Sequence, residues 1–290
     1  MAQPVLDEAG RYFDTPKAYY SWYDYRIPTQ TAAIEALKLL APNDTTIAQL
    51  QQWLLHEKRT TAWSTNINSV NAVYAFLYGA DGKAELNKLA TGEPTALYLD
   101  GKAIELPKAT AGIGFVKVAE PLTTTAAAPR QLTADKTTDG TSWGAVYGQF
   151  QQPATSVTNA TAGLKVSREM YLADDKSATD RSTFKVGQKV VVRITIEADR
   201  DYDFVTVQDK RAACMEPVSQ LSGYHWGYYL APQDNATNYY FDQLSKGRHV
   251  VETTYFIDRA GSYSTGICTA QCTYAPEYTA REAAKVITVE

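Results

Sequence analysis

The chain has 290 residues, a length typical of about two domains. Hydrophobic residues make up 44% of it and charged residues 21%, with a net charge of −4, so the composition is that of a folded protein. The acidic balance and the lack of a Lys/Arg block offer no binding surface for nucleic acid or an anionic membrane. A membrane span needs about 20 consecutive apolar residues, and the sequence contains no such run.

The amino-terminal segment provides no targeting information. Residues 1–8 include neither a basic region nor an apolar stretch, so no export signal is expected in this chain. We therefore expect either a cytosolic protein or a piece of a longer exported one.

The helical signals come first. Residues 31–40 place Ala33, Ile34, Leu37 and Leu40 on one helix face, and Pro42 ends that helix. After cap-forming residues at 43–46, a second helix has the apolar stripe Ile47, Leu50, Trp53 and Leu54. A third helix, from about Asn68 to Gly79, is expected to turn inward the side chains of Val70, Val73, Tyr74 and Leu77. Three helices cannot enclose a core alone, so the aromatic run at 19–25 is interpreted as packing surface for further helices.

Strand signals follow Gly82. Residues 96–99 and 102–106 flank Asp100-Gly101, a pair that supplies the positive φ angles of a type I′ hairpin turn. Further strands are predicted at 113–118, 142–150, 164–171, 189–197, 204–208, 237–241, 250–257 and 262–274. Because no helical pattern separates them, these strands predict antiparallel β-sandwiches, with a boundary near residue 165.

Cysteine usage excludes a disulfide framework, since the count is three. Cys268 and Cys272 are expected on one strand, about 13 Å apart at ~3.3 Å per residue, which is too far for a bond. A bond from Cys214 to either of them stays open.

No pattern of catalytic or metal-binding residues is present. His56, His225 and His249 lie in separate segments, and the sequence lacks the His-Glu-x-x-His, Cys-x-x-Cys, Gly-x-Ser-x-Gly and Gly-rich phosphate motifs. The acidic residues at 199–203 fail as a calcium loop, because its sixth and twelfth positions hold Phe204 and Lys210. We expect an acidic loop between strands there, and no metal, cofactor or nucleophile.

Tyrosine is abundant, at 20 residues. Aromatic faces suit pyranose rings, so a sugar-stacking platform is one interpretation of two aromatic groups, namely Tyr20, Trp22, Tyr23 and Tyr25, and Tyr224, Trp226, Tyr228 and Tyr229. Packing in sandwich cores and interfaces is the interpretation that we favour.

One long segment carries a family resemblance. Residues 24–33 lead to residues 52–65, which read Gln-Trp-Leu-Leu-His-Glu-Lys-Arg-Thr-Thr-Ala-Trp-Ser-Thr, and then to Ala-Val-Tyr-Ala-Phe-Leu at 72–77. This resembles the closing helices of the thioester domain in bacterial alpha-2-macroglobulin-like proteins. Residues 142–147 and 163–171 resemble the passage from that domain into the last macroglobulin-like domain.

The later residues agree in order. Residues 205–217 occupy the place of a strand followed by Asp-x-x-Pro-Ala-Gly-x-Glu, with Asp209, Ala213 and Glu216 matching. Residues 258–263 and 274–278 are similar to members of the Bacteroidetes type. The resemblance covers nearly the whole chain.

The chain departs from this family at its reactive site. Protease-trapping members carry Cys-Gly-Glu-Gln, whose Cys and Gln form a thioester, whereas this chain has Cys214-Met215-Glu216-Pro217 in another domain. Because Pro217 has no side-chain amide, no thioester is expected, and the protease-cut bait region would lie upstream.

The resemblance implies a multidomain α + β chain, in which partial α/α toroid helices precede antiparallel macroglobulin-like β-sandwiches. Its expected parts are a truncated thioester-type domain at 1–83, a CUB-like β-sandwich at 84–165 and a macroglobulin-like domain at 166–290. The implied function is that of a non-enzymatic scaffold in a protease inhibitor. Its partners would be proteases, through the intact protein, and other domains of the same chain, and the intact protein would be periplasmic or on the cell surface.

A polysaccharide lyase or carbohydrate-binding protein is the alternative, because toroid helices followed by sandwiches also describe such proteins. A lyase needs a Tyr or His base near an Arg, and His56 with Arg59 is the one pair at suitable spacing.

Three charged residues, Asp209, Arg211 and Glu216, follow a strong strand and form the predicted structural or interface site. A solvated loop is one interpretation. The sharper hypothesis is that Glu216 pairs with Arg211 or Arg259 and fixes this loop against the neighbouring sheet.

Overall fold

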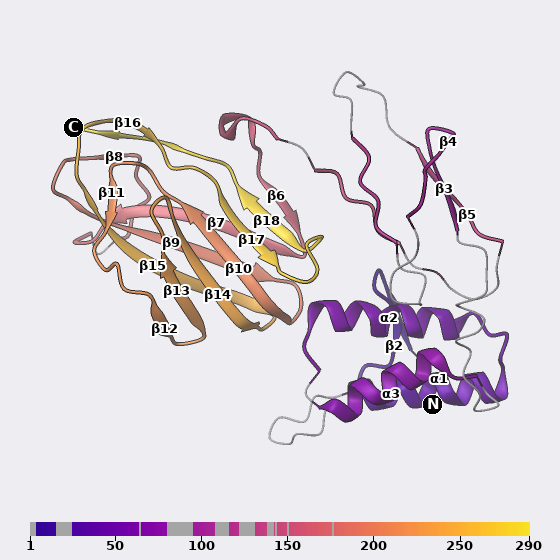
Figure 1. Cartoon of the computed structure of the whole chain (residues 1–290). Helices are drawn as coiled ribbons and strands as arrows, with labels where there is room; N and C mark the ends of the chain where they lie inside the picture. Colours follow the sequence, from indigo (N-terminus) through magenta and orange to yellow (C-terminus); the bar gives the residue numbers. More distant parts are fainter. Residues whose placement is uncertain are drawn as a thin grey trace. The chain divides into compact units, whose positions relative to one another are not determined.

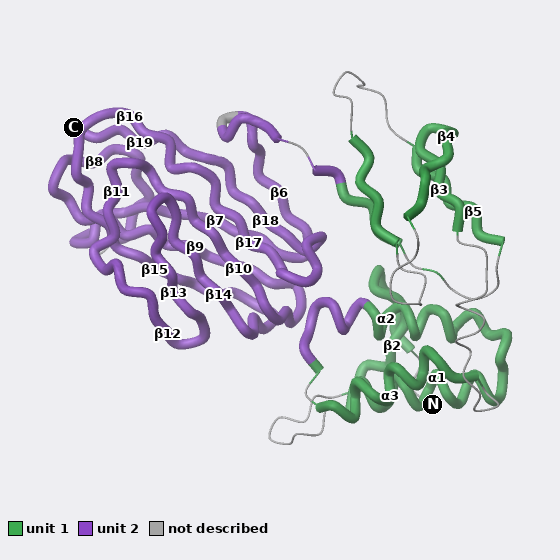
Figure 2. Tube along the Cα trace, viewed as in Figure 1, with its two compact units in different colours: residues 1–55, 63–147 green, residues 56–62, 148–290 purple. Residues whose placement is uncertain are grey.

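The structure is a computed structural model that describes residues 4–15, 25–63, 65–79, 95–107, 116–121, 131–137, 142, 144–149, 151–175 and 177–290. The chain forms two compact units, residues 1–55 with 63–147 and residues 56–62 with 148–290 (Figures 1 and 2). Among the described residues there are three α-helices, and the strand pairs are antiparallel except for one. No helix of this described part is both long and apolar enough to span a membrane.

The helices lie where the sequence predicts them. They are α1 (Arg26–Leu40), α2 (Thr46–Thr60) and α3 (Asn66–Leu77), preceded by a hairpin of β1 (Val5–Asp7) and β2 (Gly10–Tyr12). Asp44 accepts a hydrogen bond from the Thr46 backbone N–H at 2.8 Å at the start of α2, and Thr65 caps α3 through the Asn68 N–H at 3.2 Å. The predicted stripe of α2 is buried as expected, from Ile47 to Leu54.

The inward face of α3 differs from the prediction. Val70, Val73 and Tyr74 are 65%, 54% and 41% exposed, and the buried residues are Asn68, Ala72 and Ala75. These small side chains let the α3 backbone come close enough to accept hydrogen bonds at the Ala75 carbonyl, from Lys38 Nζ at 2.8 Å and Gln51 Nε2 at 3.1 Å. The predicted inward position of Leu40 is also wrong, since this side chain is 80% exposed.

The predicted Asp-Gly hairpin is confirmed. Asp100 and Gly101 have φ angles of 51° and 79° between β3 (Ala96–Leu99) and β4 (Lys102–Ala103). A third strand, β5 (Leu132–Asp135), pairs with the other side of β3 and was not predicted; it is four residues long and all of them are exposed.

Two predicted strands of this region are not found. Residues 142 and 144–149 form no strand, and Val146 is 74% exposed, so the apolar alternation there buries nothing. Residues 116–118 are not a strand either, while residues 113–115, like the aromatic residues 19–24, lie outside the described part of the chain.

The second unit is built on one long sheet. Its strand order is β11-β15-β9-β7-β6-β18-β17-β10-β14-β13-β12, and a smaller sheet has the order β16-β19-β8. The large sheet comprises β6 (Ala160–Ala162), β7 (Leu164–Leu172), β9 (Lys189–Ala198), β10 (Tyr202–Lys210), β11 (Met215–Pro217), β12 (Gly223–His225), β13 (Tyr228–Pro232), β14 (Ala236–Leu244), β15 (Gly247–Ile257), β17 (Cys268–Cys272) and β18 (Thr279–Glu282). The smaller sheet comprises β8 (Thr183–Phe184), β16 (Gly261–Ser264) and β19 (Val286–Val289).

The predicted long strands are confirmed as β7, β9, β10, β14 and β15. The predicted strand at 262–274 is instead two strands, β16 and β17, because Gly266 interrupts it with a φ of +68°. Asp199 and Asp201 lie in the connection between β9 and β10, as expected, whereas Asp203 already belongs to β10.

The large sheet folds over so that its two halves face each other. Short strand β6 pairs with β7 on one side and β18 on the other, which joins β7, β9 and β15 to the half containing β17, β10 and β14. Alternate residues of these strands turn inward and form a single buried core that includes Ile194, Val207 and Tyr239. The arrangement is an antiparallel β-sandwich.

Gly163 provides a test of the β6–β7 connection. It has a φ of +72°, and a Cβ atom there would overlap the Tyr202 hydroxyl and the Tyr278 ring. Gly187 has a similar φ of +86°, but its added Cβ would meet open space. Gly187→Ala should therefore lower the free energy of unfolding by about 1 kcal/mol, the cost of a positive φ, and Gly163→Ala by more than about 2 kcal/mol. Denaturant titration of both variants measures the difference, and equal losses would show that the close approach at Gly163 is unimportant.

Candidate functional site: a buried ion pair in the sandwich

Arg168 and Asp209 form an ion pair inside the sandwich. Their side chains are 1% and 2% exposed, and Arg168 Nη1 lies 2.7 Å from Asp209 Oδ1. On β7 the inward positions alternate with outward ones, so Arg168 is turned inward between the outward residues Ser167 and Glu169. Asp209 occupies an inward position of β10 in the other half of the sheet. The pair therefore joins the two halves.

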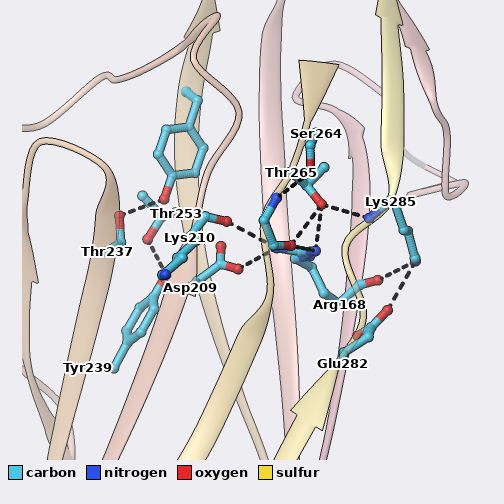
Figure 3. Close-up of polar contacts among 12 residues, drawn as sticks. Arg168, Asp209, Lys210, Thr237, Tyr239, Thr253, Ser264, Thr265, Glu282 and Lys285 are labelled. Carbon is cyan, nitrogen blue, oxygen red and sulfur yellow. Dashed lines mark hydrogen bonds and ion pairs between the residues drawn. The ribbon is translucent and has the colours of Figure 1, made fainter. Parts of the chain in front are cut away.

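The Arg168 guanidinium has a nearly complete set of partners (Figure 3). Its Nη1 atom also donates to the Lys210 carbonyl oxygen at 3.1 Å. Its Nη2 atom donates to Thr265 Oγ1 at 2.7 Å and to the Gly266 carbonyl oxygen at 2.9 Å. Only Nε lacks a hydrogen-bond partner within the described residues. The Arg168 side chain thus ties the turn at 264–267 to β10.

Lys285 extends the network to the surface. Its Nζ atom donates to the Arg168 carbonyl oxygen at 2.9 Å and lies 3.3 Å from Glu282 Oε1 (Figure 3). It also lies 3.5 Å from Asp180 Oδ2, while the other oxygen of Asp180 accepts from the Met170 N–H at 2.8 Å. The loop after β7 is therefore attached to the same cluster.

Two pairs of hydroxyl groups make further bridges between the halves. The Tyr239 hydroxyl lies 2.6 Å from Thr253 Oγ1, and Thr237 Oγ1 lies 2.7 Å from the Tyr255 hydroxyl (Figure 3). In each pair one residue comes from β14 and the other from β15. All four groups are buried, so each satisfies the other where no water reaches.

Burial dominates the electrostatics of the cluster. Burial raises the pKa of Asp209 to about 6, although the Arg168 guanidinium opposes this shift. Burial also raises the pKa of the neighbouring Cys268 thiol well above its usual value. A protonated thiol and a carboxylate already bound to Arg168 provide neither a nucleophile nor an accessible base. The cluster is organised for stability and not for turnover.

The predicted site residues are only partly brought together. Asp209 belongs to the buried cluster, and Arg211 follows it at the end of β10. The Arg211 guanidinium donates to three carbonyl oxygens, those of Met215 at 3.1 Å, Asp234 at 2.8 Å and Ala236 at 2.9 Å. The loop after β10 is therefore held by hydrogen bonds from the Arg211 side chain to backbone carbonyl groups.

The expected pair between Glu216 and an arginine is not formed. Glu216 is exposed on β11, because the neighbours on either side of it, Met215 and Pro217, occupy the inward positions. Arg211 is engaged with the carbonyl groups, and Arg259 pairs with Asp258 at 2.8 Å.

Sequence reasoning missed Arg168. The signal was present, since Arg168 interrupts the apolar positions Leu164, Val166 and Met170 of a strongly alternating strand. A charged residue at an inward position predicts a buried partner of opposite charge.

The other reactive side chains are dispersed or enclosed. Cys214, Cys268 and Cys272 are all free and buried, so the bond that the sequence left open for Cys214 is not formed. A His56 ring nitrogen is hydrogen-bonded to the Tyr278 hydroxyl, and Arg59 pairs with Glu277 at 2.6 Å. Among the described residues, no group of three or more His, Cys, Asp and Glu side chains could hold a metal ion.

Comparison with protein-family models gives one match. Residues 163–277 match the bacterial alpha-2-macroglobulin MG10 domain. This segment, shorter than half of the chain, begins just before β7 and extends past β17, so it contains the strands that carry Arg168 and Asp209. No curated protein sequence matches the chain.

Solved structures of bacterial alpha-2-macroglobulins are similar to nearly the whole chain. A mutant of Salmonella alpha-2-macroglobulin matches 95% of this chain and 18% of its own length, at 14% identity and a TM-score of 0.43. Trypsin-activated alpha-2-macroglobulin from Escherichia coli matches 92% of this chain and 19% of its own length, at 13% identity and a TM-score of 0.48. This chain therefore spans about a fifth of the length of these proteins.

Removing the cation of the buried pair should be costly. Arg168→Leu strands the Asp209 carboxylate in the core and should lower the free energy of unfolding by about 3–5 kcal/mol. Lys165→Ala is the matched control on the same strand, because its pair with Glu197 is 58% and 49% exposed and should contribute under about 1 kcal/mol. Urea denaturation of the two variants measures both effects. If the two substitutions lower the free energy of unfolding by similar amounts, Arg168 and Asp209 do not form a buried ion pair.

The raised pKa of Asp209 makes a prediction about pH. The folded protein binds the Asp209 proton more tightly than the unfolded chain does. Protonation of Asp209 therefore adds to the free energy of unfolding at low pH, and this stabilisation is lost as pH rises through about 6. Relative to Asp209→Asn, the wild-type protein should lose roughly 3 kcal/mol of stability between about pH 4 and pH 7. Denaturant midpoints of both proteins across this range measure the change. A difference that is constant or grows with pH would mean that the pKa of Asp209 is not raised.

The positions of Arg211 and Glu216 predict unequal effects. Glu216→Ala removes an exposed side chain and should change the free energy of unfolding by under about 1 kcal/mol. Arg211→Ala removes the hydrogen bonds to three carbonyl oxygens and should cost about 1.5–3 kcal/mol. Thermal or urea unfolding distinguishes the two, and a larger loss for Glu216→Ala would restore the original hypothesis of a Glu216 ion pair.

Proposed function

We propose that this chain is the C-terminal part of a bacterial alpha-2-macroglobulin-like protein and serves as a non-catalytic scaffold for protease trapping by the intact protein. The observation that carries the proposal is the match of residues 163–277 to the bacterial alpha-2-macroglobulin MG10 domain. We infer that a protease is the partner of the intact protein; two of the similar solved structures are described as activated by trypsin and by porcine elastase.

The chemistry of the second unit favours a scaffold over an enzyme. The thiol of Cys214, which begins the sequence Cys-Met-Glu-Pro, is buried, and burial raises its pKa. The arginine, aspartate and hydroxyl groups of the core bind one another. His56 and Arg59, the pair that a lyase would use, are engaged with Tyr278 and Glu277, so no observation favours the lyase alternative.

The finer parts of the proposal come from the sequence resemblance. We infer a truncated thioester-type domain at 1–83 with partial toroid helices, a CUB-like sandwich at 84–165 and a macroglobulin-like domain at 166–290. The intact protein would be of the Bacteroidetes type and exported to the periplasm or cell surface. Of the three predicted site residues, Asp209 and Arg211 would then be structural, since Asp209 is buried against Arg168 and Arg211 binds backbone carbonyls. Glu216 would mark an interface with another domain, because it is exposed.

The test uses the intact protein that contains this chain. It is incubated with trypsin or elastase, and the remaining protease activity is measured on a large protein substrate and on a small peptide substrate. Trapping predicts that the large substrate is protected while the small peptide is still cleaved. The 290-residue chain alone is the control and should protect neither. Unchanged cleavage of the large substrate by the intact protein would contradict the proposal.

A truncated helical domain also predicts uneven stability. Helix α3 exposes Val70, Val73 and Tyr74 to solvent, as a helix would that has lost its neighbours. Native-state hydrogen exchange should therefore show the amides of α1 and α3 opening at lower free energy than those of β9 and β15. Equal protection of the helices and these strands would contradict the inferred truncation.

A further inference from the structure

A shallow groove of about 200 Å³ opens on the outer face of β10 and β14, beside the residues that follow β17. Its walls combine three aromatic rings with a carboxylate and two threonine hydroxyl groups, from Phe204, Thr206, Tyr240, Asp242, Thr273 and Tyr274. The three rings are accessible, with Phe204 and Tyr240 41% exposed and Tyr274 62% exposed. We propose that this groove binds one ring of a neutral polysaccharide. The proposal does not rest on the scaffold function.

Further aromatic residues continue from the groove toward the edge of the sheet. Tyr240 is paired in register with Tyr229, and Tyr229 with Tyr224, so the three side chains lie on one face of neighbouring strands. The rings of Tyr224 and Tyr229 have centroids 4.9 Å apart, and Tyr224 is 79% exposed. This row, the tyrosine strip, gives a polymer further rings to contact beyond the groove.

Phe204 is held in an unusual backbone conformation at the groove. Its φ is +58°, a region that bulky residues rarely adopt, although β10 keeps its pairing with β14 on either side of it. The ring is directed against Tyr274 in an edge-to-face contact with centroids 5.4 Å apart. This backbone conformation lowers the stability of the fold, but it keeps the Phe204 ring exposed as one wall of the groove. Strained residues of this kind gather at binding sites.

The polar groups of the groove suit a sugar. Asp242 is the one charged residue among the lining residues, and its carboxylate has no hydrogen bond or ion pair within the described part of the chain. The Tyr240 hydroxyl accepts from Asn238 Nδ2 at 3.2 Å and keeps its own proton for a ligand. The faces of pyranose rings pack on aromatic side chains, while a carboxylate and hydroxyls bind their OH groups. A polyanion is disfavoured, because the lining has a carboxylate and no cation.

The dimensions favour a polymer over a free small molecule. Pockets for drug-sized ligands enclose roughly 300–1,000 Å³, more than this groove provides. A single ring would fill it, and the affinity would come from neighbouring rings along the tyrosine strip. A neutral glycan chain lying across β14 and β13 could place one ring in the groove and neighbouring rings on the tyrosine strip.

The experiment is affinity electrophoresis of the full 290-residue chain in gels that contain dextran, laminarin, mannan or galactan. At least one of these polysaccharides should retard the chain. Tyr240→Ala and Asp242→Ala should each raise the dissociation constant about tenfold, the factor that corresponds to ~1.4 kcal/mol. Tyr240→Phe should keep most of the affinity, because it retains the ring.

Phe256→Ala is the matched control, since Phe256 is a 40% exposed aromatic residue on β15, outside the groove and the tyrosine strip. It should change the dissociation constant by less than about twofold. Retardation by none of the four polysaccharides would overturn the proposal, as would retardation that Tyr240→Ala leaves unchanged. If Tyr240→Ala instead expands the intact protein in size-exclusion chromatography and no glycan binds, the face is an interdomain contact and the proposal is wrong.

Discussion

The ion pair between Arg168 and Asp209 is the interaction on which the sandwich depends. An isolated charge in a protein core costs several kcal/mol, so each of these residues requires the other at hydrogen-bonding distance. That requirement fixes the position of β7 against β10, in opposite halves of the folded sheet. It also fixes the turn at 264–267, whose Thr265 and Gly266 complete the shell of Arg168. Lys285 then attaches the loop after β7 to the same cluster.

In this sandwich the residues that stabilise the fold are buried, and the residues that a partner could contact lie on its surface. The buried carboxylate, thiol and hydroxyl groups bind one another and are closed to solvent, so the interior offers no chemistry to a substrate. The groups that a partner can reach lie on the outer face of β10 and β14 and on the edge strand β11, where Glu216 is exposed. A rigid sandwich with a recognisable surface is what a scaffold requires, and the match to the MG10 domain is consistent with that role.

How much the sequence reveals depends on whether a feature is local. The Asp100-Gly101 turn follows from two residues that tolerate positive φ, and the long strands follow from their alternation. Strands of three or four residues, such as β11 and β18, are too short for their alternation to stand out in the sequence, and they exist because longer strands pair with them. The prediction of the inward face of α3 was wrong, because the small residues Ala72 and Ala75 are buried there in place of the larger Val70 and Val73. Asp209 could be singled out as one of three charged residues close together in sequence. Its partner lies 41 residues away and is recognised only from the inward–outward alternation of β7.

A double-mutant cycle on Arg168 and Asp209 measures how far each residue depends on the other for stability. The free energy of unfolding would be measured in urea for Arg168→Leu, Asp209→Leu and the double variant. Each single variant leaves one buried charge without its partner. If the ion pair holds the two halves of the sheet together, the double variant should therefore be more stable than either single variant. If the losses of the two single variants simply add in the double variant, the two residues act independently and the account is contradicted.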